Sequence, residues 1–179
     1  MNFRTLLVLF RNVSVVSYQK GDIILPQGSK EKYLFFIRKG LVRCYYTDRD
    51  AEETTFNLFP EYQTFANAHA VLLDEASKFS YQAIERTKVY RMDYDAFYRL
   101  ANQNPKISDM NRSYLGKRHL KQVLTRMESF VLHSPEERYL EFIKKYPNLI
   151  NRAPNKYIAH ILGITPVSLS RIRSRLAAK

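Results

Sequence analysis

At 179 residues, of which 45% are hydrophobic and 13% aromatic, the chain is long enough to bury a core in one ordinary domain and a small second one, so it is globular and not disordered. Its formal net charge of +12 indicates a polyanionic partner. A single cysteine excludes an intramolecular disulfide, and an iron-sulfur cluster or zinc knuckle within one chain. We expect a cytoplasmic protein, because the N-terminal apolar run 6–10 is far shorter than the roughly 20 residues that span a bilayer.

Residues 13–92 have the pattern of β structure. Short apolar runs are separated by turn residues, as at Gly21-Asp22, at Lys39-Gly40 and in the loop 47–51 that precedes a strand over 53–59. Many short strands of this kind predict an antiparallel β roll, also called a double-stranded β-helix.

The pattern becomes helical after Asp93, which is placed to cap a short helix. Asn104-Pro105 then opens a longer helix to about Leu132, on the order of 40 Å at 1.5 Å per residue. This helix bears an apolar stripe made of Met110, Tyr114, Leu120, Leu124, Met127 and Val131. The stripe either packs on its own β domain or pairs with a second copy of the helix, and its near-heptad spacing favours the pair.

A capping box at Ser134-Pro135-Glu136-Glu137 predicts another helix, which Pro147 ends. In the C-terminal segment, Ile158, Ala159 and Leu162 form one apolar face. Gly163 then allows a turn with positive φ, and Thr165 and Pro166 begin a second helix with Leu169, Ile172 and Leu176 inward. These are the packing requirements of a helix-turn-helix.

The basic charge is concentrated in this part of the chain. Residues 101–179 carry 15 Lys and Arg against 5 Asp and Glu, and no acidic residue follows Asn151. On the outward side of the last helix, we expect Val167, Ser170 and Arg171 to contact DNA bases. The residues that we expect to contact phosphates are Lys156, Thr165, Ser168 and Arg173. The alternatives are a basic helical hairpin with a solvated face, or a helix that binds a membrane surface.

In this order of elements the chain resembles the Crp/Fnr family of bacterial transcription regulators. The segment "KGDIILPQGS" is similar to the opening of a cyclic-nucleotide-binding-like β roll, and "YIAHILGITPVSLSRIR" is similar to the family's DNA reader. The resemblance implies an α+β protein with a sensor roll over 1–104, a long dimerisation helix over 105–132 and a helix-turn-helix domain over 133–179. It also implies a homodimer on double-stranded DNA, with RNA polymerase as a further partner.

Two segments depart from the family pattern. Where the family's phosphate-binding cassette has Gly-Glu and then Arg with a small hydroxyl residue, this chain has Ala66-Asn67 and Ser77-Lys78. A cyclic phosphate would lose its arginine partner, so we do not expect cyclic AMP to bind in the usual manner. An unknown effector pocket would involve Asn67, Ser77 and Lys78. Family members that read the best-known half-site carry Arg-Glu where this chain has Pro166-Val167, so we expect a different half-site.

Other functions find less support in the sequence. Only His69 of the four histidines lies in the β region, so we expect neither the metal site of a cupin-like enzyme nor any other catalytic centre or cofactor. Cys44 is expected to be a buried apolar group and not a redox sensor. The alternative to a transcription regulator is a small-molecule sensor module whose output is mainly a protein–protein contact.

Overall fold

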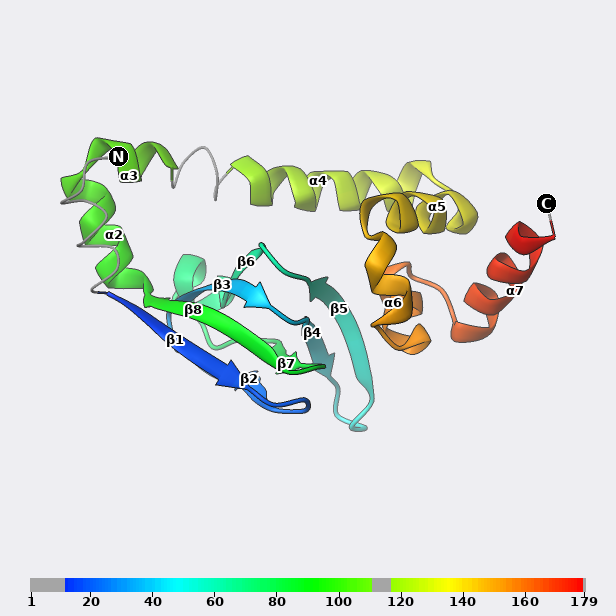
Figure 1. Cartoon of the computed structure of the whole chain (residues 1–179), viewed down its shortest axis with the longest axis horizontal. Helices are drawn as coiled ribbons and strands as arrows, with labels where there is room; N and C mark the ends of the chain where they lie inside the picture. Colours follow the sequence, from blue (N-terminus) through cyan, green and yellow to red (C-terminus); the bar gives the residue numbers. More distant parts are fainter. Residues whose placement is uncertain (1–11, 111–116, 179) are drawn as a thin grey trace.

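The computed structural model describes residues 12–110 and 117–178. Its N-terminal half is a β roll of two four-stranded antiparallel sheets, with strand orders β1-β8-β3-β6 and β2-β7-β4-β5 (Figure 1). The strands are β1 (Val13–Tyr18), β2 (Ile23–Leu25), β3 (Tyr33–Lys39), β4 (Val42–Thr47), β5 (Glu53–Phe59), β6 (Thr64–Ala66), β7 (Ser80–Ala83) and β8 (Thr87–Asp93). The predicted antiparallel β roll is confirmed.

The core of the roll lies between the two sheets. Alternate residues of β3, such as Phe35 and Ile37, face Cys44 and Ala83 of the opposite sheet within one buried cluster. This alternation follows from the two-residue period of a strand, which sends successive side chains to opposite faces. Phe35 stacks on Phe65 with ring centroids 4.7 Å apart, so large aromatic rings fill much of the interior.

The break between β3 and β4 depends on Gly40. Its φ is +105°, and a Cβ at this position would lie 2.4 Å from Thr87 Oγ1 and 2.6 Å from Thr87 Cα. Only glycine therefore allows the chain to reverse here and to pass close to the start of β8. A single turn of π-helix, η1 (His69–Leu73), links β6 to β7.

The remaining described residues are mostly helical. The elements are α2 (Tyr94–Gln103), α3 (Pro105–Met110), α4 (Lys117–Leu132), α5 (Pro135–Lys145), the 3₁₀ helix η3 (Pro147–Asn151), α6 (Asn155–Ile161) and α7 (Pro166–Ala177). Asp93 caps α2 by accepting a hydrogen bond from the Ala96 amide, and the capping box at Ser134 is complete. Helix α3 begins at Pro105 and α4 ends at Leu132, which agrees with the limits predicted for the long helix. Residues 111–116 lie outside the described residues, so one continuous helix stays a prediction.

Helix α4 runs along one side of the roll, and α6 lies between the roll and α7 (Figure 1). The mixed α+β class is confirmed, with strands in the first half and helices in the second. Over the described ranges, no helix is long and apolar enough to cross a membrane.

Candidate nucleic-acid interface

The turn between α6 and α7 requires glycine for two reasons. Gly163 has a φ of +66°, and a Cβ there would lie 2.6 Å from Cε1 of Phe130 on α4. The Ile164 amide donates to the Ala159 carbonyl at 3.0 Å, which closes the turn against α6. The predicted positive φ is confirmed, and the contact with Phe130 adds a steric reason that the local sequence does not contain.

Helix α7 begins as predicted. The Thr165 hydroxyl accepts a hydrogen bond from the Ser168 amide at 3.1 Å, and Pro166 occupies the first turn. Leu169 and Ile172 are buried in one cluster with Ile158 and Ala159 of α6. The predicted apolar packing between the two helices is therefore confirmed.

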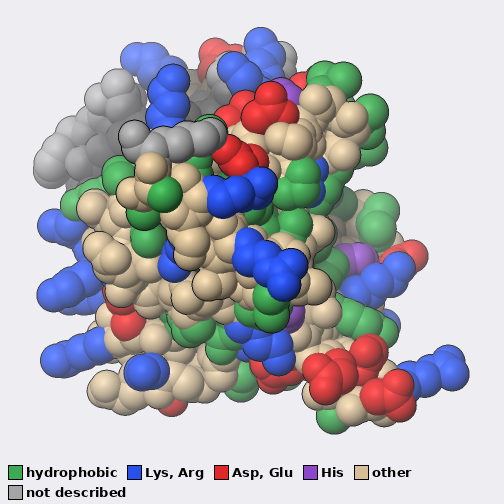
Figure 2. All heavy atoms as spheres, turned by 90° about the vertical axis from the view of Figure 1, so that its right-hand side faces the viewer, with side chains coloured by type: hydrophobic (Ala, Val, Ile, Leu, Met, Phe, Trp, Pro, Cys, Tyr) green, Lys and Arg blue, Asp and Glu red, His purple; other side chains and the backbone are tan. Residues whose placement is uncertain are grey.

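The opposite side of α7 is open to solvent. Val167 is 61% exposed, and Ser170 and Arg171 are also exposed. Lys156 is exposed on α6, and Ser168 is half-buried beside its capping partner Thr165. Figure 2 looks onto the end of the molecule that carries α7 and shows Lys and Arg side chains across this face. The helix thus presents apolar, hydroxyl and guanidinium groups together, which suits contacts to base edges.

Arg173 lies differently from its neighbour Arg171. Its Nε donates to the Tyr139 hydroxyl at 3.1 Å, and its Nη1 donates to Asn155 Oδ1 at 2.7 Å. The guanidinium also lies over the Tyr139 ring, 5.6 Å from its centroid. Arg173 therefore ties α7 to α5 and α6, and the structure does not bring it together with the exposed groups of α7. Arg175, the next arginine, pairs with Glu136 at 3.2 Å.

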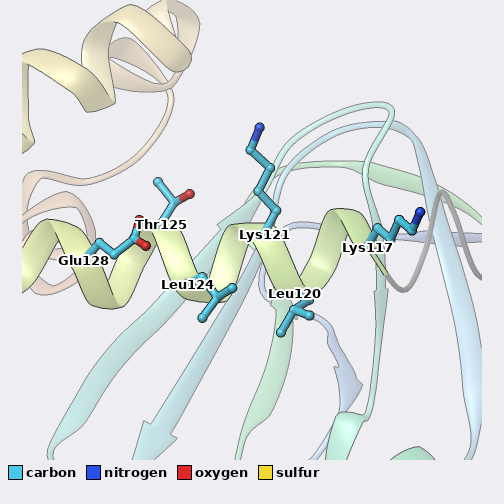
Figure 3. Close-up of a pocket in the computed structure, with 6 residues that line it drawn as sticks. All are labelled: Lys117, Leu120, Lys121, Leu124, Thr125 and Glu128. Carbon is cyan, nitrogen blue, oxygen red and sulfur yellow. The ribbon is translucent and has the colours of Figure 1, made fainter.

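The apolar stripe of α4 is exposed. Four members of the predicted stripe have large exposed fractions, namely Leu120 (59%), Leu124 (48%), Met127 (63%) and Val131 (83%). Figure 3 shows Leu120 and Leu124 pointing to the same side of the helix, and both are among the residues of α4 that line a shallow hollow of about 360 Å³. Tyr114 and the side chain of Met110 lie outside the described residues.

Sequence periodicity missed three further apolar residues of α4. Val123, Phe130 and Leu132 are also exposed, at 56%, 42% and 71%. Exposed apolar area of this extent on one helix is typical of an interaction surface. Within the described part of the chain, the stripe is not packed on the β roll, which removes the first of the two interpretations that its spacing allowed.

The predicted effector residues do not form an open anion site. Asn67 is fully buried, its amide nitrogen donates to the carbonyls of Ser29 and Glu31, and its Oδ1 accepts from the Ala70 amide. The Ser77 hydroxyl is buried and exchanges hydrogen bonds with the backbone of Phe79. Asn67 and Ser77 thus hold loops together through their side chains. Lys78 is exposed.

Cys44 is buried, as predicted, at 2% exposure. Burial raises the pKa of its thiol to about 12, although hydrogen bonding with Tyr81 and the charges of Arg126 and Arg43 oppose the shift. A thiol that stays protonated is a poor nucleophile and a poor metal ligand. Among residues 12–110 and 117–178, no three His, Cys, Asp or Glu side chains are grouped as a metal site requires.

Known proteins resemble this chain in the β roll and in the overall fold. Residues 15–104 match the model of the family described as "Cyclic nucleotide-binding domain". Among curated proteins, the chain is similar to Electron transport regulator A of Shewanella oneidensis, with 27% identity over 176 residues. The match covers 88% of this chain and 66% of that protein's length.

Two solved structures share the fold along most of their length. FixK2 from Bradyrhizobium japonicum superposes with a TM-score of 0.78 at 17% identity, covering 93% of this chain and 85% of that chain. CooA from Carboxydothermus hydrogenoformans, solved as a mutant, has a TM-score of 0.70 at 20% identity and covers 95% and 78%. The chain therefore shares its fold with FixK2 and CooA along most of its length.

Proposed function

Because the chain belongs to the cyclic nucleotide-binding domain family, which covers its β roll, we propose that it is a sequence-specific DNA-binding transcription regulator that acts as a homodimer. The observation that carries the proposal is the two-sided character of α7. Leu169 and Ile172 are buried at 0% and 3% exposure, while Val167, Ser170 and Arg171 are exposed on a helix that begins with a capped turn.

Each exposed group has a defined task in a major groove. Arg171 donates two hydrogen bonds to O6 and N7 of a guanine, Ser170 bonds to a base or phosphate, and Val167 contacts a thymine methyl group. The capped N-terminus of α7, with Thr165 and Ser168, faces a phosphate, and Lys156 neutralises another. Arg173 has no role in phosphate binding here, because Tyr139 and Asn155 hold its guanidinium within the protein.

The exposed stripe of α4 supplies the dimer contact. Two copies of α4 that pair through Leu120, Leu124 and Met127 bury apolar area that a monomer leaves in water. A two-fold axis along this pair places two α7 helices in successive major grooves, about 34 Å apart, on a near-palindromic site. Bound there, the dimer is placed to contact RNA polymerase.

The β roll is the sensor part in this proposal, but cyclic AMP is not its ligand in the usual manner. The three hydrogen bonds of Asn67 to the backbone leave its amide group fully engaged. Ser77 stands where the resemblance places the family's arginine, and Lys78, which follows it, is exposed. A solvated lysine offers a cyclic phosphate much less than a buried, two-pronged arginine does.

The test is selection of bound duplexes from a random pool, followed by titrations at several salt concentrations with and without cyclic AMP. Arg171→Ala is expected to cost about 1–3 kcal/mol and to relax the preference at one base pair. Lys156→Ala is expected to weaken binding to all duplexes alike and to reduce the salt slope by about one.

Arg99→Ala is the matched control, because Arg99 is an exposed arginine on α2, far from α7 along the chain. It should leave both affinity and preference unchanged. An equal loss on every duplex for Arg171→Ala would contradict base reading by this residue. A specificity ratio near one for the unaltered protein would contradict the proposed function as a whole, and cyclic AMP should change neither quantity.

A further inference from the structure

The helix-turn-helix formed by α6 and α7, called the reader below, shares one apolar core with the β roll. Leu41 and Leu58 of the roll are buried in the same cluster as Leu149 of η3, Ile158 of α6 and Ala153, which lies between these two helices. Moving these helices away from the roll would expose both leucines to water. The roll and the reader are therefore joined by a packed apolar interface as well as by the chain that connects them.

An arginine of β4 lies buried at this contact. Arg43 is 1% exposed, and its guanidinium lies between the rings of Tyr45 and Tyr157, 4.1 and 4.0 Å from their centroids. Its Nε donates to Thr55 Oγ1 at 2.9 Å, and its Nη1 pairs with Glu53 at 2.7 Å. Since Tyr157 belongs to α6, one face of this buried cation is covered only while α6 stays docked.

A second arginine, which belongs to the C-terminal part of the chain, binds carboxylates of the β roll. Arg152 follows η3 and binds both carboxylate oxygens of Glu61, at 2.9 and 2.7 Å, and both of Glu85, at 2.6 and 3.3 Å. These hydrogen bonds raise the pKa of Arg152. Burial alone would raise the pKa of Glu61, but hydrogen bonds from Arg152 and from the Gly40 amide outweigh burial and lower it. Two bidentate pairs on one guanidinium fix orientation as well as distance.

The edge of β5 is held by two different helices. This strand ends its sheet, so part of its backbone has no neighbouring strand. The Thr55 amide donates to His160 Nδ1 on α6 at 3.0 Å, and the Phe56 carbonyl accepts a hydrogen bond from Arg126 on α4. Phe130, one turn further along α4, fills the space beside Gly163. Strand β5 therefore contacts both α4 and α6, and α4 also contacts the turn between α6 and α7.

We propose that these contacts lock each helix-turn-helix to the β roll of its own protomer, so that roll and reader move as one body and the spacing of the two readers is fixed. The part of this inference that concerns the spacing of two readers on DNA rests on the proposed function. The lock itself is a property of one chain. Any signal that alters DNA binding must then either rotate the locked bodies relative to each other at the α4 pair or break the lock.

The first experiment measures how the dissociation constant depends on the spacing between two half-sites, varied one base pair at a time. The unaltered protein should show a sharp optimum. Arg152→Gln should raise the dissociation constant at the best spacing at least about tenfold and flatten the profile, because flexibly tethered readers lose effective concentration. Its affinity for a single half-site should stay within about twofold, which also shows that the reader is folded.

Lys144→Gln is the matched control, since it removes one positive charge from an exposed position of α5. It should keep the sharp optimum. Arg152→Lys keeps the charge without the two-pronged geometry and should lie between the two. Tyr157→Leu, which uncovers Arg43 while keeping apolar bulk, should flatten the profile in the same way as Arg152→Gln. A profile for Arg152→Gln that matches the control would overturn the proposal.

The second experiment needs no DNA. Hydrogen exchange of the Thr55 amide, followed by NMR, should be at least about tenfold faster in Arg152→Gln than in Lys144→Gln, because undocking removes the His160 acceptor and exposes the strand edge. Equal exchange would overturn the lock. If the unaltered protein proves to have no sequence preference, the proposed function fails, and the exchange comparison still decides the lock.

Discussion

Helices α4 and α7 both carry stripes of apolar side chains at similar spacing, yet the chain covers only the stripe of α7. On α7, Leu169 and Ile172 are buried against α6, whereas on α4, Leu124 and Met127 are exposed at 48% and 63%. The difference arises from the surroundings, because side chains of α5 and α6 pack with Leu169 and Ile172 in one buried cluster, while α4 passes along the roll (Figure 1). A covered stripe stabilises the fold, and an uncovered one is available to a partner.

The largest expected effect is on the covered stripe. Leu169→Ala should lower the free energy of unfolding by about 2–5 kcal/mol, because it leaves a cavity in a fully buried cluster. Urea denaturation followed by circular dichroism measures the change. Val167→Ala on the exposed side of the same helix is the control and should stay within about 0.5 kcal/mol. Similar losses for the two variants would erase the distinction between the two sides of α7.

A substitution in the uncovered stripe of α4 should weaken dimer association and leave the stability of the folded monomer nearly unchanged. Leu124→Asp should raise the dimer dissociation constant at least about 100-fold, equivalent to about 2.7 kcal/mol, because it places a carboxylate in an apolar seam. Analytical ultracentrifugation over a range of concentrations measures it. Thr125→Asp adds the same charge at an exposed position that Figure 3 shows pointing away from Leu124, and it should leave the dimer intact. If the unaltered protein stays monomeric at micromolar concentration, the uncovered stripe of α4 is not a dimer surface.

The smallest effect concerns the contact between α6 and β5. Burial first, and then the positive charges of Lys156 and Arg43, lower the pKa of His160, while Glu52 opposes the shift. A folded-state pKa below the ordinary value near 6.5 means that the unfolded chain takes up the proton first. The stability contributed by neutral His160 is therefore complete above pH 6.5 and is lost as the pH falls below that value and through the lower folded-state pKa.

Denaturation at pH 7.5 and pH 5.5 tests this contribution. The unaltered protein should lose more stability between the two pH values than His160→Gln, which has no titrating group at this position. His133→Gln is the control, because His133 pairs with Glu141 away from the roll, and it should retain the full pH dependence that His160 gives. An identical pH dependence for the unaltered protein and His160→Gln would show that the Thr55 contact carries no proton linkage.

The local features of the fold were predictable from the sequence. The caps at Asp93, Ser134 and Thr165 and the positive φ of Gly163 depend on a few adjacent residues, so neighbouring letters are enough to identify them. The exposed face of α7 followed from helical periodicity in the same way.

Contacts between distant segments were not predictable. Arg171 and Arg173 are two positions apart on one helix, yet only Arg173 meets Tyr139 and Asn155, which come from other helices. Arg152 lies in the segment after Asn151 that contains no acidic residue, but it binds Glu61 and Glu85, which are 91 and 67 residues away. No periodicity or spacing rule connects such partners before the chain is folded.

The buried thiol of Cys44 has a practical consequence for measurements of domain motion. With a pKa near 12, the single native cysteine should react very slowly with maleimide dyes at neutral pH. Fluorophores can therefore be attached at engineered surface cysteines while the native one is kept, and energy transfer between a dye on the roll and a dye on α7 would report the distance between them in single molecules.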